Sequence, residues 1–157
     1  MQWRGVVSCL RITVVSLSVM IGLGLPWAGW AWAASAPAQL PAETLTIHLG
    51  TAAGALRFEP DYLEFVAGQR YKLMLDNPSN QKHYFTAKDF ADAVWSQKVE
   101  AGNVEIKGAI HELELKPGAQ AEWVFIPQKS GLYELHCSIA GHAEAGMMGQ
   151  IEVKAPV

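Results

Sequence analysis

Three side chains that can bind a metal follow one another near the C-terminal end of the chain. Cys137, His142 and Met147 are spaced five residues apart. Gly141 and Gly146 lie between them and allow the backbone to fold tightly. A thiolate, an imidazole and a thioether gathered around one point would form a site for a small metal ion.

The types of these ligands indicate copper. Soft sulfur combined with imidazole favours copper, and two histidines with one cysteine and a weak axial methionine are typical of blue-copper electron-transfer sites. Taken singly, Cys137 fits a buried apolar residue and His142 an ordinary loop residue. Together with Met147 at the end of a strand-like run, they favour a metal site, which still needs a second histidine.

His83 is the candidate for that second histidine. It ends an Asn- and Pro-rich stretch that begins at Asn77, directly after an apolar strand. A loop that leaves a rigid strand can deliver one imidazole, while Tyr84 or Phe85 enters the core and fixes its position. The other histidines of the mature part have weaker claims: His48, His111 and His136.

The elements that must position these residues are β-strands. In the first of them Ile47 and Leu49 share one face, which places His48 on the other, solvent-facing side. Short alternating runs separated by turn residues predict an all-β antiparallel sandwich or barrel. Strands are expected over residues 44–49, 56–58, 62–66, 71–75, 109–115, 121–126, 132–137 and 150–154.

One segment interrupts the strand pattern. Residues 88–98 carry apolar side chains at helical spacing, namely Phe90, Ala91, Val94 and Trp95. A short helix or an irregular excursion is therefore expected in this segment.

The N-terminal region has the features of an export signal. Arg4 and Arg11 precede an apolar stretch, and small residues up to Ala33 fit a cleavage site. Because residues 12–42 carry no charge, an uncleaved membrane anchor is the alternative. We expect a secretory signal peptide over residues 1–33, a flexible linker over 34–43 and one domain over 44–157.

The charge and the cysteine content of the exported part limit its possible functions. Without Arg4 and Arg11, 10 basic and 15 acidic residues leave a net charge of −5, with no basic patch for nucleic acid. Cys9 lies in the expected signal, so Cys137 is the only exported cysteine and has no disulfide partner. A bound metal would protect its thiolate in the periplasm, or in the thylakoid lumen of a photosynthetic organism.

Three stretches together resemble the cupredoxins: residues 83–85, residues 129–137 and the ending Cys-x4-His-x4-Met-x-Gly. The ligand-loop spacing is most similar to rusticyanin, with plastocyanin and azurin as relatives. The resemblance covers about residues 44–154 and implies a Greek-key sandwich with one type 1 copper ion that cycles between Cu(II) and Cu(I). Its equatorial ligands would be His83, Cys137 and His142, and its axial ligand Met147.

Two families of copper enzymes also resemble the chain at His136-Cys137. In multicopper oxidases and copper nitrite reductases, the histidine beside the cysteine binds a second copper ion. Those enzymes need further histidine pairs and further domains, whereas strand alternation points His136 and Glu134 to solvent. The chain is therefore expected not to be an enzyme.

The resemblance implies an exported carrier that moves one electron at a time between redox partner proteins. Partners would dock transiently near His142, over a small apolar rim formed by Ile139, Ala140, Ala143 and Ala145. Membrane contact is expected only if the N-terminal segment stays uncleaved. The alternatives are a copper-binding protein for periplasmic storage, delivery or tolerance, and an accessory domain of a larger complex.

Overall fold

The computed structural model describes residues 41–156, so the expected signal peptide, residues 1–33, and most of the expected linker, residues 34–43, lie outside the described residues. The helix α1 spans Lys88–Asp92. No helix within residues 41–156 is long and apolar enough to cross a membrane. The strands are β1 (Glu43–Leu49), β2 (Phe58–Glu59), β3 (Tyr62–Val66), β4 (Tyr71–Asp76), β5 (His83–Thr86), β6 (Val94–Ala101), β7 (Val104–Ile106), β8 (Glu112–Leu115), β9 (Gln120–Pro127), β10 (Gly131–His136) and β11 (Met148–Lys154).

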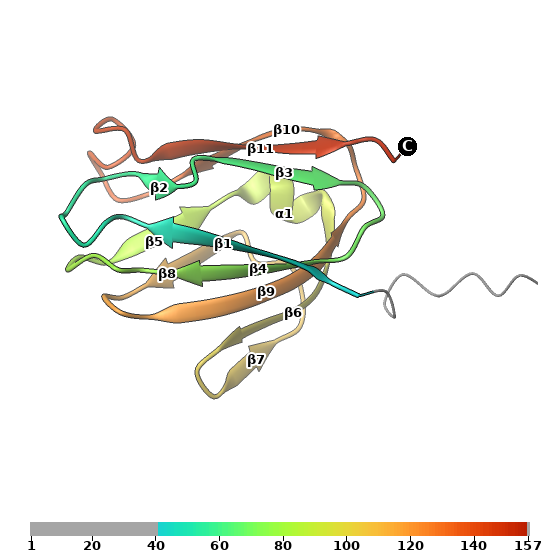
Figure 1. Ribbon diagram of the computed structural model, residues 1–157, viewed down its shortest axis with the longest axis horizontal. Helices are drawn as coiled ribbons and strands as arrows, with labels where there is room; N and C mark the ends of the chain where they lie inside the picture. The colour runs from blue at the N-terminus through green and yellow to red at the C-terminus, as the bar shows by residue number, and fades with distance from the viewer. Residues whose placement is uncertain (1–40, 157) are drawn as a thin grey trace, which may run out of the picture. The chain divides into compact units, whose positions relative to one another are not determined.

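The strands form two sheets that pack face to face (Figure 1). The first sheet has the order β2-β1-β4-β9-β6-β7, and the second has the order β3-β11-β10-β5-β8. The β1–β4 and β3–β11 pairs are parallel. The other strand pairs are antiparallel. This arrangement confirms the predicted all-β sandwich.

Alternating apolar residues place the core between the two sheets. In β1, Ile47 and Leu49 are fully buried, whereas His48 is half-buried on the outer face, as the sequence predicts. In β10, Leu135 is buried and Glu134 is exposed, which also follows the predicted alternation. The strand period therefore determines which side chains reach the interior.

The short helix expected within residues 88–98 is present as α1, and it ends earlier than the apolar spacing suggests. Only Lys88–Asp92 is helical, without a side-chain cap at Ala87, and the chain then enters β6 at Val94. The apolar spacing in this segment fits a helix, but β6 pairs with β9 and so satisfies its backbone groups in a sheet. As a result Trp95 is 48% exposed and does not share the buried face of Phe90.

Four short strands also differ from the expected pattern. The strand expected at 56–58 is the two-residue β2, and the one expected at 109–115 contracts to β8. Besides β6, two short strands were not predicted: β5, which begins at His83, and β7, a three-residue edge strand. Both are too short for an alternation pattern to stand out in the sequence.

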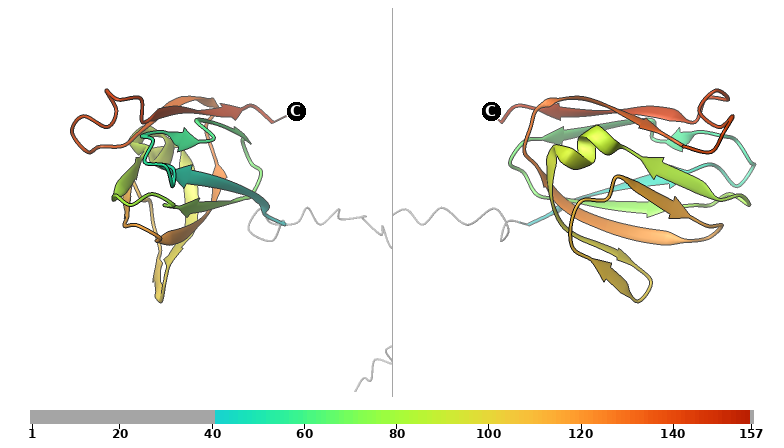
Figure 2. Two further views of the ribbon diagram at one scale, coloured as in Figure 1. Left: turned by 60° about the vertical axis from the view of Figure 1, so that its left-hand side comes forward. Right: turned by 180° about the vertical axis from the view of Figure 1, so that it is seen from behind.

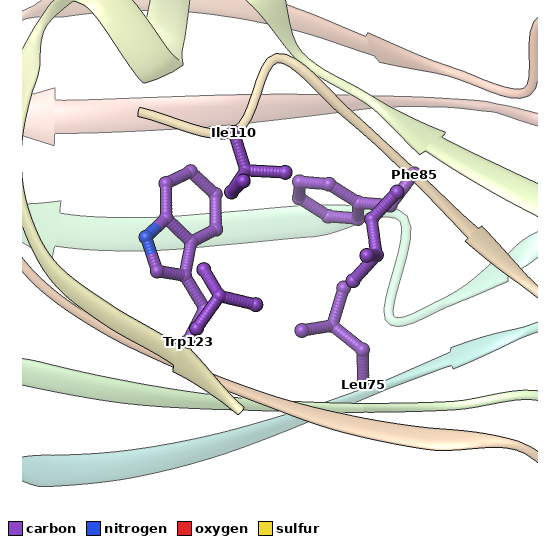
Figure 3. Close-up of a pocket in the computed structure, with 6 residues that line it drawn as sticks. Leu75, Phe85, Ile110 and Trp123 are labelled. Carbon is purple, nitrogen blue, oxygen red and sulfur yellow. The ribbon is translucent and has the colours of Figure 1, made fainter. Parts of the chain in front are cut away.

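A small void lies in the apolar interior (Figure 3). Its volume is about 10 Å³, about the space that one water molecule needs, and its lining is apolar. None of the four expected metal ligands lines it. The lining residues are Leu75, Phe85, Val99, Ile110, Leu113 and Trp123. The void is therefore too small and too apolar to be the metal site.

Three loops gather at one end of the sandwich, opposite the end where β11 leads to the C-terminus (Figure 1). They are the turn between β1 and β2, the loop between β4 and β5, and the loop between β10 and β11. The β6–β7 hairpin projects from the rest of the sandwich (Figure 2). The loop end therefore brings together segments that are far apart in the sequence.

Candidate metal centre

Three of the expected ligands converge at the loop end of the sandwich. The ligand atoms of His83, Cys137 and His142 all lie within 4.8 Å of one another. The Cys137 Sγ atom is 3.5 Å from the His142 Nδ1 atom, and the centroids of the two imidazole rings are 5.2 Å apart. Among residues 41–156, no other group of three or more His, Cys, Asp or Glu side chains is close enough to hold a metal ion.

His83 is placed by the first position of β5, where it pairs with Leu115 of β8. Its side chain is 1% exposed, and its buried Nδ1 atom has no hydrogen-bond partner. A buried nitrogen without a partner is costly, and a metal ion bound to Nδ1 would remove that cost. Burial lowers the pKa of His83, and nearby His142 lowers it further, which favours the neutral imidazole that binds metals.

Cys137 directly follows β10 and is 1% exposed and unpaired. Its Sγ atom accepts a hydrogen bond of 3.4 Å from the backbone N–H of Tyr84, the residue after His83. A donor at this distance stabilises a thiolate and links the cysteine loop directly to β5. Phe85, the next residue of β5, enters the core as expected and anchors this strand.

The loop from residue 137 to residue 148 is closed by backbone hydrogen bonds. Cys137 N–H donates to the Met147 carbonyl at 3.1 Å, and Met147 N–H donates to the His142 carbonyl at 2.9 Å. Gly146, at φ +105°, allows the reversal just before Met147. Met147 is fully buried, whereas Met148 is 47% exposed, so the two neighbouring thioethers lie on opposite sides of the loop.

The donor set fits copper. Two imidazoles and a thiolate that converge, with His83 and Cys137 buried and His142 partly buried, are together with a buried thioether in the same loop the residue types of a type 1 copper site. The buried His83 Nδ1 atom has no hydrogen-bond partner and belongs to a side chain of the converging cluster, so it is available to bind an ion.

The remaining histidines form no second cluster in the described part of the chain. His48 Nδ1 lies 2.5 Å from Asp76 Oδ1, and His111 Nε2 lies 2.7 Å from Asp92 Oδ1. Both pairs are at the surface.

His136 faces outward, as expected. Its Nδ1 atom lies 2.8 Å from Glu134 Oε1, in a geometry that is poor for a hydrogen bond. Both residues line a polar surface cavity of about 200 Å³ together with Lys88 and Asp89.

Sequence reasoning missed the residues that surround His83. Gly50, in the turn after β1, packs against its ring, and Ser79, which is hydrogen-bonded to Asn77 in a buried polar network, lies next to Gly50. The turn at residues 50–54 was predicted, but its contact with the ring joins segments more than thirty positions apart. The signal that was available is an Asn two positions before a Ser, a pattern typical of side-chain-capped turns.

Comparisons with known proteins agree with this geometry. Residues 63–157 match the family model described as multicopper oxidase. The multicopper oxidase mco of Staphylococcus epidermidis is 29% identical over 103 residues, which are 62% of this chain and 23% of that protein. The chain therefore spans about a quarter of the length of the curated relatives it matches.

Solved structures support the fold. The multicopper oxidase of Pediococcus acidilactici aligns with a TM-score of 0.57 and 16% identity, over 73% of this chain and 27% of that one. A dithionite-reduced auracyanin from the photosynthetic bacterium Roseiflexus castenholzii aligns with a TM-score of 0.51 and 19% identity, over 72% of this chain and 98% of that one. The same sandwich thus occurs as one part of a longer chain and as nearly an entire chain.

Proposed function

This chain belongs to the multicopper oxidase family, and we propose that it binds one type 1 copper ion in a cupredoxin-like fold and transfers single electrons. The observation that carries the proposal is the convergence of His83, Cys137 and His142 within 4.8 Å around an unpartnered buried nitrogen.

The prediction that the chain is not an enzyme is wrong, because residues 63–157 match a family of oxidases. The prediction rested on the few spare histidines in this one domain. That count has little weight, because the chain spans only 23% of the relatives' length and further ligands of such oxidases can lie in other domains.

Each ligand has a distinct role in the proposed site. His83, Cys137 and His142 would be the equatorial ligands, and Met147 would be the weak axial one. When bound, copper supplies a one-electron couple between Cu(II) and Cu(I). The number of ions, the axial role of Met147 and the likeness of the ligand loop to rusticyanin are parts of the proposal.

The residues around the ligands restrict their movement. His83 is held by β5, and Cys137 is tied to the same strand through the Tyr84 N–H. Backbone hydrogen bonds close the loop that carries His142 and Met147. Ligands that barely move between two oxidation states keep the reorganisation cost of electron transfer low, and burial of Cys137 excludes water from the thiolate.

His142 would be the exit for the electron. It is only partly buried, and the expected apolar rim around it is half-buried to exposed. This rim consists of Ile139, Ala140, Ala143 and Ala145. A small surface of this kind suits weak, transient contact with a redox partner, and the exposed Glu144 beside it would influence the choice of partner.

The proposed compartment is outside the cytoplasm, in the periplasm or the thylakoid lumen. The expected signal over residues 1–33 supports export, and the unpaired Cys137 would be protected there by its bound metal.

A redox titration of the copper-loaded protein tests the function. We expect one copper ion per chain, a single reversible one-electron step and retention of the ion in both states. A protein that releases Cu(I) to a chelator on reduction would instead be a copper-delivery protein, and a site that binds zinc but no copper would contradict the proposal.

A further inference from the structure

The turn after β1 packs against the ring of His83, one of the proposed copper ligands. Gly50 is buried, and a Cβ atom added to it would lie 2.6 Å from His83 Nε2 and 2.9 Å from His83 Cδ2. Distances this short leave no room for any side chain. The imidazole ring therefore occupies the space that a side chain at position 50 would need.

The ring atoms that face Gly50 determine how a side chain at position 50 would affect the metal site. Nε2 and Cδ2 form the edge of the imidazole opposite Nδ1, and Nδ1 is buried without a hydrogen-bond partner. Because the Nε2 edge faces Gly50, Nδ1 is the nitrogen that His83 has left to offer to the cluster with Cys137 and His142. Pressure on the Nε2–Cδ2 edge moves Nδ1 relative to these two ligands.

Gly50 itself has little freedom to retreat. Its N–H donates to the Arg57 carbonyl at 2.9 Å, and Thr51 N–H donates to the Ala55 carbonyl at 3.2 Å. The Thr51 hydroxyl accepts a further hydrogen bond of 3.0 Å from Ala55 N–H. These hydrogen bonds restrict the movement of the turn away from the His83 ring.

The loop before β5 closes the space next to Gly50 from another side, so an added methyl group could not move away from His83 in that direction. The same added Cβ atom would lie 3.1 Å from Ser79 Cβ. The Ser79 Oγ atom lies 2.8 Å from Asn77 Oδ1, and Asn77 Nδ2 donates to the Gln81 carbonyl at 2.7 Å and to the Leu115 carbonyl at 2.8 Å. Asn77 and Ser79 are 1% and 5% exposed, so this network fixes Ser79 in the interior.

We propose that Gly50 is a positioning residue for copper: because it lacks a side chain, the His83 ring packs against the β1–β2 turn, with Nδ1 directed to the point where the Cys137 and His142 ligand atoms meet. The inference rests on the proposed function. The left-handed backbone favours glycine at both position 50 and position 54, where φ is +76° and +82°. Only Gly50 also faces His83, because a Cβ atom added to Gly54 would have no neighbour within 4 Å.

Gly54 provides a matched control in the same turn. Gly50→Ala and Gly54→Ala introduce the same methyl group at similar positive φ angles, so backbone strain is similar in both variants. We expect Gly50→Ala to weaken Cu(II) affinity roughly 10- to 100-fold, the usual effect of losing a residue that orients a ligand, and to change the EPR spectrum. Gly54→Ala should keep the wild-type affinity and spectrum. Equal affinities and equal spectra for the two variants would overturn the proposal.

A double-mutant cycle on the metal-free protein separates the contact from copper chemistry. Gly50→Ala should lower the urea concentration at the midpoint of unfolding more than Gly54→Ala does. This difference between the two variants should vanish in a His83→Ala background, because the new methyl group then enters the space that the His83 ring has left. If Gly50→Ala does not fold alone, His83→Ala should restore folding. A difference that persists without His83, or folding that is not restored, would overturn the proposal. If the wild-type protein shows no copper site, the proposed function fails, and this cycle still decides the role of Gly50.

Discussion

Met147 and Met148 are adjacent in the chain but have opposite environments. Met147 is fully buried within the ligand loop, whereas Met148 begins β11 and is 47% exposed. Only one of two neighbouring side chains can point to the copper, because the chain enters an extended strand between them. The burial pattern supports Met147 as the axial ligand.

Substitution of these two residues tests that assignment. The axial thioether is a weak donor that favours Cu(II), so Met147→Leu should keep the blue colour but raise the reduction potential. Met148→Leu should leave the potential unchanged, because its side chain faces solvent. Voltammetry of both variants measures this difference. A shift caused by Met148→Leu alone would place the axial ligand one residue later.

At the scale of single residues, the four expected ligands could be proposed from sequence but Gly50 could not. Cys137, His142 and Met147 lie close together in one loop, so their types and spacing can be seen in the sequence. The contact between Gly50 and His83 depends on how two distant loops pack, and no local pattern records it. The hydrogen bond from Tyr84 to Cys137 is also invisible in the sequence, because the donor is a backbone N–H.

At the scale of elements, α1 is a short helix of five residues whose main contact with the core is the side chain of Phe90. Phe90 is fully buried, and its ring contacts Phe65 of β3 and Phe125 of β9 at centroid distances of 5.6 Å and 5.3 Å. It also lies 5.7 Å from the ring of Tyr133 on β10, the strand that leads to Cys137. A helix this short has little stability of its own, so this packing determines its position.

The two aromatic residues of the segment 88–98 differ in burial, so their replacement by alanine should have different effects on the free energy of unfolding. Phe90→Ala should lower the free energy of unfolding by about 3–5 kcal/mol, because it leaves a cavity between the sheets. Trp95→Ala should cost less than about 1 kcal/mol, because its side chain is 48% exposed on β6. Urea unfolding of the metal-free variants measures both values. Similar losses would mean that both rings pack in the core, as a single helix would require.

This segment also shows why elements were predicted only in part. The apolar spacing of Phe90, Val94 and Trp95 fits a helix, but the pairing of β6 with β9 decides the structure, and the paired residues lie 22 to 33 positions apart in the sequence. Long alternating runs such as β1 and β4 were predicted because their pattern is local.

At the scale of the whole molecule, export is a prediction that concerns residues outside 41–156. The small residues before Ala34 and the apolar stretch before them favour cleavage near Ala33. Mass spectrometry of protein from an exporting host should therefore show a mature chain that begins near residue 34. A full-length mass together with membrane association would establish the N-terminal segment as an anchor.

The central claim is that the three converging side chains hold copper through a thiolate. The most direct test is reconstitution of the protein with Cu(II), followed by absorption and EPR spectroscopy. We expect the intense thiolate-to-copper charge-transfer band of a blue site in the wild-type protein, and its loss in Cys137→Ser. A protein that takes up only zinc, or that binds copper without this band, would contradict the account.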